Sequence, residues 1–551
     1  MNAPAFNRRE FTAGLGAIVV AFSLDPKLAR GQERLPGSLQ TNRRLDGWIR
    51  INADGTAIIF TGKVELGQGI LTALAQIAAE ELDLPLSRIK MISGDTGQTP
   101  NEGQTAGSQS IENSGTALRM AAAEVRAILV DLAAKRLGLA ADQLTVADGA
   151  IAAPDGRKVG YGDLNPDLDR EASAKASPKP PAAHKIVGKS ISRLDIPAKV
   201  TGGAAFVQDM RLPGMLHGRV VRPPRYGSKL DSVDEAAAKA MPGVVAVVRD
   251  GSFLGVVAER EEQAINARAA LLKSAKWTLG PELPDPARLF DVIKSLPSKD
   301  ATIGVKEGAA PANARTFEAV YTKPYMAHAS IGPSCAVAEF KDGKLTSWSA
   351  SQATHTLRKQ LAKMFAISVE DVRCLYLEGA GCYGRNGHED AAADAALLAK
   401  SVNRPVRVQW SRADEHGWDP KGPPTLIDLG AAIDAGGTVT AWDSEFFIPQ
   451  QTPNAFFVPL IAATLGQLPA DDTIAPGNIF QNSNIPYKFA NVRTVCHRLE
   501  TTPLRPSWIR TPGRMQNTFA NECPPPVLTR GSVLDPLDGS VQTKIENIEV
   551  P

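Results

Sequence analysis

The stretch Gly379-Ala380-Gly381-Cys382-Tyr383-Gly384-Arg385 places four glycines or small residues around one aromatic side chain. It follows the apolar run 372–377, which is expected to be a strand, and precedes a helical pattern that begins near Glu389. A strand, a glycine-rich turn and a helix in this order suit the binding of a phosphate or a planar ligand. The stretch matches neither GxGxxG nor GxxxxGK[ST], so the common nucleotide-binding loops fit it poorly.

A second glycine-containing segment, Gly62-Lys63-Val64-Glu65-Leu66-Gly67-Gln68-Gly69, lies between a predicted hairpin strand and a helix. Gly67 and Gly69 allow backbone N–H groups to approach a ligand closely, and Gln68 offers both a donor and an acceptor. The segment therefore predicts a ligand-binding loop, with a tight structural turn as the alternative.

Two further segments combine turns with polar side chains. Thr105-Ala106-Gly107-Ser108-Gln109-Ser110 precedes the helix expected at 114–137, and Gly107, Ser108 and Ser110 suit an anion-binding nest or a plain N-capping loop. Residues 504–514 place Arg505, Arg510 and Arg514 in a turn-rich segment. Arginines of this kind suit anion capture, although a solvated surface loop is the alternative.

The order of patterns along the chain predicts an α+β protein of several parts. Residues 40–165 read as a hairpin followed by helices, 166–185 as a linker, and 186–279 as a compact α+β domain whose one helix is expected at 233–240. Residues 310–523 mix strands and helices, and 524–551 have neither a helical stripe nor a pattern of paired strands.

Charge and metal-ligand patterns exclude several classes of function. The 551 residues include 61 Lys and Arg and 59 Asp and Glu, a net charge of +2, so no nucleic-acid partner is expected. The five cysteines contain no CxxC, and the seven histidines contain neither HxH nor HExxH. We therefore expect no metal-ligand set, zinc site or iron–sulfur cluster held by this chain alone.

The first 30 residues are typical of an export signal. Arg8-Arg9 precede a short apolar run, 12–24, that is too short to cross a bilayer of about 30 Å as a helix. The pattern resembles a twin-arginine signal, which exports folded proteins, and predicts a location in the periplasm or on the periplasmic face of the inner membrane. An amphipathic N-terminal helix is the alternative.

Taken together, the segments resemble the molybdenum-cofactor subunit of the xanthine dehydrogenase/aldehyde oxidase family, of the isoquinoline 1-oxidoreductase β-subunit and membrane-associated aldehyde dehydrogenase type. The KVELGQG, GDT, TAGSQS, SASQ, GAGCYGR and SWIRTPGR segments occur in the order of that subgroup between residues 8 and 523. The resemblance implies an α/β hammerhead domain, at 186–279, inserted between two parts of a molybdenum-cofactor-binding domain, 40–165 and 310–523.

The resemblance also implies roles for individual residues. Gln352 corresponds to the glutamine that hydrogen-bonds the apical molybdenum oxo group, and Arg510 to the arginine near the substrate. Tyr383 and Gly384 correspond to the Phe-Gly pair beside the metal and pterin, with Tyr in place of Phe, and Arg385 follows them. The implied cofactor contacts elsewhere are Gly67, Gln68 and Gly69 for the pterin and Gly107, Ser108 and Ser110 for the pyrophosphate.

The implied function is hydroxylation of an aldehyde or N-heteroaromatic substrate with water as the oxygen source. The implied cofactor is molybdopterin with molybdenum, expected in the cytosine dinucleotide form. Because this chain has no cluster motif, the resemblance implies that the electrons pass to a separate small [2Fe–2S] subunit, and in many members of the family also to a cytochrome c subunit.

One expected catalytic segment is missing. The family uses a glutamate in a GVGE-type segment as a general base, and here the resemblance stops after Cys523. The sequence therefore predicts a C-terminally truncated large subunit, with loss of activity as one expectation. A non-catalytic binding or assembly remnant that pairs with the iron–sulfur subunit is the first alternative, and an unrelated exported α/β binding protein is the second.

Overall fold

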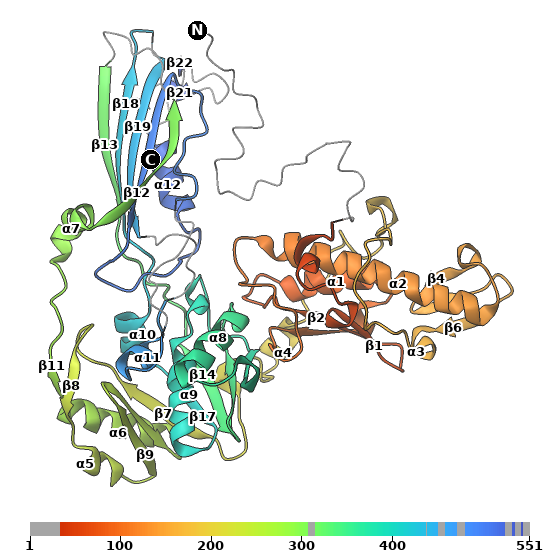
Figure 1. Cartoon of the computed structure of the whole chain (residues 1–551), viewed down its shortest axis with the longest axis horizontal. Helices are drawn as coiled ribbons and strands as arrows, with labels where there is room; N and C mark the ends of the chain where they lie inside the picture. Colours follow the sequence, from red (N-terminus) through yellow and green to blue (C-terminus); the bar gives the residue numbers. More distant parts are fainter. Residues whose placement is uncertain are drawn as a thin grey trace.

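The structure is a computed structural model that describes residues 34–306, 315–436, 438–449, 458–470 and 480–523, and two short strands at 532–534 and 541–543. The expected export signal at 1–30 lies outside the described residues. Figure 1 shows three bodies: an arm that carries α1 and α2, a central body around β7, β14 and β17, and an elongated sheet that carries β13, β18 and β19. No helix in the described ranges is both long and apolar enough to span a membrane.

The arm is built on two three-stranded sheets and two long helices. The elements are β1 (Ile49–Ile51), β2 (Ala57–Thr61), α1 (Ile70–Leu82), β3 (Ile89–Ser93), α2 (Thr116–Leu137), β4 (Thr145–Ala147), β5 (Ala150–Ala152), β6 (Lys158–Gly160) and α3 (Tyr161–Leu164). β1 and β2 form the expected hairpin, and β3 adds parallel to β2. Trp48, Leu74 and Leu118 are fully buried in its core, so α1 and α2 pack on this sheet through the apolar stripes seen in the sequence.

The central body is built around a seven-stranded sheet that mixes two stretches of the chain, with a separate two-stranded sheet of β8 and β11. The strands of the larger sheet lie in the order β16-β15-β14-β17-β7-β10-β9. The elements are α4 (Ile196–Val200), β7 (Leu216–Val221), β8 (Lys229–Ser232), α5 (Glu235–Lys239), β9 (Val244–Asp250), β10 (Phe253–Ala258), α6 (Glu261–Ser274), β11 (Lys276–Thr278), β14 (Cys335–Lys341), β15 (Lys344–Ser349), α8 (Thr354–Phe365), β16 (Val372–Tyr376), α9 (Asp390–Val402), β17 (Val406–Gln409), α10 (Arg412–Trp418) and α11 (Ile461–Leu465). Because β7 pairs in parallel with β17, the strands within residues 216–258 belong to the same sheet as the strands within residues 335–409.

Two expectations about secondary structure were wrong. The stretch 186–279 holds the short α4 and the longer α6 besides α5, the helix that was expected. The buried stripe of α6, formed by Ala264, Ala267 and Leu271, is too narrow and too alanine-rich to stand out in the sequence. In the tail, β21 (Ser532–Leu534) and β22 (Val541–Thr543) pair antiparallel, although no paired strand was expected there. Each has only three residues, which is too short for an alternating pattern to register.

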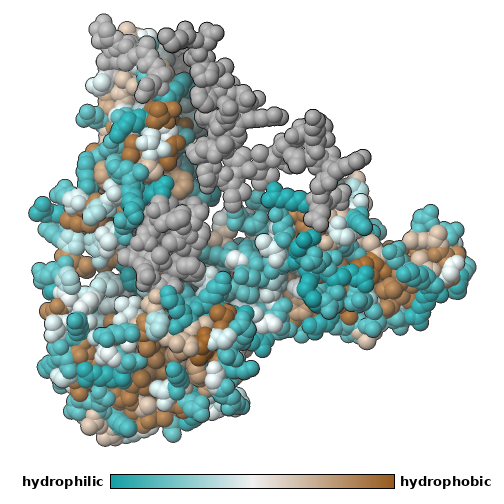
Figure 2. Space-filling view, viewed as in Figure 1, coloured by the Kyte–Doolittle hydropathy of each residue, from teal (hydrophilic) through white to brown (hydrophobic). Residues whose placement is uncertain are grey.

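The third body is a five-stranded sheet in the order β12-β20-β19-β18-β13. Its elements are α7 (Leu289–Ser295), β12 (Ser298–Lys306), β13 (Arg315–Lys323), β18 (Thr425–Ile433), β19 (Val439–Pro449), β20 (Asn491–Leu499) and α12 (Arg514–Glu522). On the face shown in Figure 2, apolar side chains occur as patches among hydrophilic ones. The overall architecture is the expected mixture of helices and strands.

Candidate functional site

Gln352 lies where three distant segments meet. It follows β15, and its side chain is 5% exposed. Its backbone N–H donates to the carbonyl of Asn386 at 2.9 Å, and its own carbonyl accepts from Thr105 N at 2.8 Å. Its side-chain Nε2 donates to the Thr105 carbonyl at 2.9 Å. The loop before α2 and the loop before α9 are thereby fixed against Gln352.

The predicted GQG loop lies between β2 and α1 and is organised by a buried glutamate. Glu65 Oε1 accepts the backbone N–H groups of Gly67 at 2.9 Å and Gly69 at 2.7 Å. Arg193, from the segment before α4, donates to the Gly67 carbonyl at 2.7 Å. The donors that the sequence predicts for a ligand are therefore already bonded to Glu65, which acts as the anion at this helix N-terminus.

Gln68 also serves its own loop. Its Nε2 donates to the Val64 carbonyl at 3.0 Å and its Oε1 accepts from Leu66 N at 2.5 Å. Val64 N donates in turn to the hydroxyl of Thr105 at 3.0 Å. Thr105 thus joins the GQG loop to Gln352, while Gln68 itself remains exposed.

The predicted nest at 107–110 lies directly after Thr105. Gly107 and Ser108 are exposed and both adopt positive φ, 67° and 60°. Ser110 is half-buried and begins a π-helix, Ser110–Gly115, that continues into α2. Ser108 at positive φ is followed by Gln109 in the right-handed region, with φ −91° and ψ 0°, and this alternation of hand is the backbone pattern of anion-binding nests.

The glycine-rich turn at 379–385 presents Tyr383 to solvent. Gly381, Tyr383 and Gly384 have φ values of 140°, 58° and 109°, an uncommon run for which glycine is required at two positions. Tyr383 is 40% exposed, and the exposed Arg510 guanidinium lies 5.3 Å from its ring centroid. Arg510 N also donates to the Tyr383 carbonyl at 2.7 Å, so the turn and the arginine loop form one unit.

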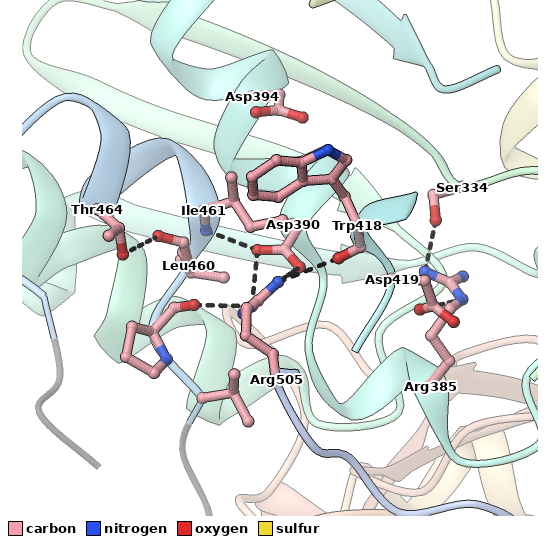
Figure 3. Close-up of polar contacts among 12 residues, drawn as sticks. Ser334, Arg385, Asp390, Asp394, Trp418, Asp419, Leu460, Ile461, Thr464 and Arg505 are labelled. Carbon is pink, nitrogen blue, oxygen red and sulfur yellow. Dashed lines mark hydrogen bonds and ion pairs between the residues drawn. The ribbon is translucent and has the colours of Figure 1, made fainter. Parts of the chain in front are cut away.

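The Arg385 side chain does not join this surface; it points into a buried ion-pair cluster. Its Nη1 donates to Ser334 Oγ at 2.6 Å and its guanidinium lies 4.0 Å from Asp419 (Figure 3). The same guanidinium lies 3.6 Å from Glu389 and 3.3 Å from Glu415. Burial opposes its charge, but these three carboxylates together raise the pKa of Arg385. Burial raises the pKa of Glu389 to about 7.

His328 connects the cluster to the arginine loop. Its ring nitrogens lie 3.1 Å from Asp419 Oδ2 and 2.5 Å from the Trp508 carbonyl. His388 stacks on the ring of Trp508 at a centroid distance of 5.2 Å, and burial lowers the pKa of His388 to about 3. Two histidines therefore fix Trp508, which lies two residues before Arg510 in the same segment.

Beside these contacts, Arg505 fixes the start of the same loop to α9 and α11. It pairs with Asp390 at 3.1 Å and donates to the carbonyls of Trp418 and Pro459 (Figure 3). Asp390 also accepts the backbone N–H of Ile461 at 2.7 Å.

Several residues of this site were not expected from the sequence. Glu65 and Cys382 stand inside the quoted motifs and could have been considered, because a carboxylate before a helix and a thiol in a glycine turn are unusual in themselves. Thr105 was quoted only as part of its loop. His328 and Asp419 carry no local signal, since their partners lie 180 and 91 residues away.

Two family models, each described as a molybdopterin cofactor-binding domain, match the chain. One matches residues 2–183 and the other matches residues 294–524. The chain belongs to the xanthine dehydrogenase/aldehyde oxidase family of molybdopterin-binding oxidoreductases. The resemblance drawn from the quoted segments is confirmed.

Curated relatives agree with this assignment. The chain is 37% identical to a nicotinate dehydrogenase subunit of Pseudomonas putida over 97% of this chain and 45% of that protein. It is 31% identical to a membrane-bound aldehyde dehydrogenase of Gluconacetobacter polyoxogenes, over 72% of this chain and 54% of that protein. It is 27% identical to the isoquinoline 1-oxidoreductase β-subunit of Brevundimonas diminuta, over 78% of this chain and 62% of that protein. The chain spans about half the length of these relatives.

The fold is also found in solved structures. Quinoline 2-oxidoreductase from Pseudomonas putida 86 matches with a TM-score of 0.50 and 19% identity, over 63% of this chain and 48% of that one. The aldehyde oxidoreductase from Desulfovibrio gigas matches with a TM-score of 0.50 and 20% identity, over 63% of this chain and 42% of that one. These matches support the α+β molybdopterin-binding fold.

The exposed face of the site fits the family's cofactor in chemistry. Ser108 and Ser110 offer hydroxyls at the nest, and a Cβ at Gly67 would meet only open space. The Thr105 carbonyl engages one Nε2 hydrogen of Gln352, which leaves the amide a second donor. Phosphate and pterin recognition needs donors and room of this kind.

Proposed function

We propose that this chain is the molybdopterin-binding large subunit of a molybdenum hydroxylase that oxidises an N-heteroaromatic compound or an aldehyde, with water as the oxygen source. The observation that carries the proposal is the junction at Gln352, where Thr105 and the turn that presents Tyr383 are hydrogen-bonded around one buried amide. The names of the relatives, which refer to nicotinate, isoquinoline and aldehydes, support the substrate class.

Each part of the site has an assigned role. Gly107, Ser108 and Ser110 would hold the cofactor's pyrophosphate, Gln68 with Gly67 and Gly69 would border the pterin, and Tyr383 with Gly384 would contact the molybdenum end of the cofactor. When bound, the cofactor supplies the two-electron chemistry. Gln352 presents an amide donor, and Arg385 supports the turn from beneath.

Arg510 is assigned to the substrate. Its guanidinium is exposed and lies above the Tyr383 ring, so an aromatic ring with a carboxylate could contact both groups. This arrangement favours an N-heteroaromatic carboxylate within the proposed substrate class.

Four further assignments belong to this proposal. The cofactor is the cytosine dinucleotide form, and the electrons pass to a small [2Fe–2S] subunit and a cytochrome c subunit. Residues 1–30 act as a twin-arginine signal that directs the folded protein to the periplasm. Residues 186–279 form the hammerhead unit, which the compact packing of α6 on β7 and β10 supports.

The test is dye-linked oxidation by the purified complex, with nicotinate, isoquinoline and benzaldehyde as substrates. We expect turnover of one of them, a loss of about 10²–10³-fold in kcat for Gln352→Ala, and a raised KM for a carboxylate substrate in Arg510→Ala. Co-purification of an iron–sulfur subunit with no turnover of any substrate would contradict the proposal and favour a non-catalytic binding role.

A further inference from the structure

The thiol of Cys382 lies between Gln352 and the turn that presents Tyr383. Cys382 is 6% exposed, and its Sγ donates to Gln352 Oε1 at 2.9 Å. The same sulfur accepts the backbone N–H of Gly384 at 3.5 Å. One buried side chain therefore contacts both the amide at the centre of the site and the strained turn at its edge.

The surroundings determine which way the Gln352 amide faces. A carbonyl oxygen can only accept, so the atom that faces the Thr105 carbonyl must be Nε2, and Oε1 then faces Cys382. A thiolate in that position would repel Oε1, whereas a thiol donates to it. Burial raises the pKa of Cys382, which keeps the group protonated.

The two contacts of Cys382 couple the amide to the turn. The Gln352 backbone is already fixed by Thr105 and Asn386, so the remaining freedom is in its side-chain torsions. Without the thiol, Oε1 would be buried with no donor from the turn and the amide could rotate about its terminal torsion. Gly384 would also lose the partner of its N–H group, in a turn where Tyr383, which has a side chain, is held at a φ of 58°.

We infer that Cys382 is a positioning residue: its thiol holds the Gln352 amide in the orientation that leaves one Nε2 hydrogen for the bound cofactor, and it links that orientation to the Tyr383 turn. The meaning of this orientation for catalysis rests on the proposed function, but the contact itself does not.

The contact is tested first in the purified chain without reference to activity, through the infrared S–H stretching band. The difference between wild type and Cys382→Ala isolates the Cys382 band, which a hydrogen bond to Oε1 shifts to lower frequency. In Gln352→Met, which removes the acceptor at nearly constant length, we expect this band to move to higher frequency. Cys374, a thiol buried in a hydrophobic cluster, is the matched control and its band should not move. A Cys382 band unchanged by Gln352→Met would overturn the inference.

The positioning role is tested next in the molybdenum-loaded enzyme. We expect Cys382→Ala to lower kcat about tenfold with KM unchanged, and Cys382→Ser, which keeps a donor, to recover most of that loss. Cys374→Ala should match wild type. Equal kcat values for wild type and Cys382→Ala would refute the role. An absence of molybdenum from every variant would instead refute the proposed function, and the infrared measurement would still decide whether the contact exists.

Discussion

Glu389 is the buried residue whose ionisation most affects this protein. It is 1% exposed, and among the described residues neither of its carboxylate oxygens has a hydrogen-bond partner. Arg385 compensates its charge from 3.6 Å, but the same guanidinium is shared with Glu415 and Asp419. Burial therefore raises the pKa of Glu389 to about 7.

A raised carboxyl pKa penalises folding at high pH. Below the unfolded value, near 4.5, both states are protonated and the penalty is absent; between 4.5 and about 7 only the unfolded state releases the proton, and stability falls by up to about 1.4 kcal/mol per pH unit. We expect Glu389→Gln to remove this fall, so that its unfolding midpoint rises relative to wild type from pH 5 to pH 8.

Urea unfolding at several pH values checks the effect of Glu389→Gln. Glu282→Gln, at a carboxylate that is 82% exposed, is the control and should follow wild type at every pH. Parallel curves for wild type and Glu389→Gln would show that Glu389 ionises normally in the folded protein.

At this scale the structure brings together residues that the sequence assigned to one site, but the surroundings of each side chain were less predictable. Gln352, Tyr383 and Arg510 were expected at a site, and the structure places Gln352 and Tyr383 on either side of Cys382 and Arg510 over the Tyr383 ring. The burial of Arg385 was not foreseeable, because the three carboxylates around it come from the residue before α9, from α10 and from the residue after α10.

At the scale of elements, the expected linker at 166–185 is bound tightly to the two long helices of the arm. Glu124 on α2 accepts the backbone N–H groups of Ser173 at 2.8 Å and Ala174 at 2.6 Å. Glu81 on α1 accepts Lys179 N at 3.0 Å, and Glu80 accepts three successive N–H groups at 185–187. Apart from the 3-10 helix Pro181–Ala183, buried carboxylates thus accept the backbone N–H groups that a helix or strand would otherwise pair.

Removing one of these carboxylates should release the segment locally. We expect Glu124→Ala to accelerate cleavage within 166–185 by roughly tenfold in limited proteolysis, because the backbone donors of Ser173 and Ala174 lose their acceptor and local opening becomes easier. The exposed Asp131, on the same helix, provides the control Asp131→Ala, whose cleavage rate should equal that of wild type. Equal rates for the two variants would mean that the carboxylate does not hold the segment.

The elements themselves were largely predictable, but their partners were not. The β1–β2 hairpin, α2, β16 and α9 follow from periodicity and turn residues at nearly their observed bounds. The pairing of β7 with β17 joins residues that are about 190 positions apart, and no local pattern specifies it.

At the scale of the whole molecule, a buried ion pair joins the stretch after β7 to α9. Arg222 pairs with Asp394, which also accepts the indole N–H of Trp410 at 2.8 Å, and the guanidinium lies 4.6 Å from the Trp410 ring centroid. Asp394 is fully buried, and burial raises its pKa to about 6. The stretch after β7 and helix α9, which are more than 150 residues apart in the sequence, are thus joined in the core by a buried ion pair.

Breaking this pair should destabilise the central body. We expect Asp394→Ala to lower the free energy of unfolding by about 3–5 kcal/mol, because it leaves the Arg222 charge buried without a partner. The double variant Arg222→Met with Asp394→Leu should recover most of that loss, since neither charge remains to be compensated. Denaturant unfolding of the three proteins measures both effects, and a double variant as unstable as Asp394→Ala would show that packing, rather than charge, accounts for the loss.

Cofactor binding by this chain is tested most directly by the molybdenum and pterin content of the purified, folded chain, produced in a host that makes the cofactor. We predict molybdenum and pterin in equal amounts in wild type, with both reduced when Gly107→Val and Ser108→Val together block the proposed pyrophosphate nest. Folded wild-type protein that contains neither molybdenum nor pterin would contradict this prediction.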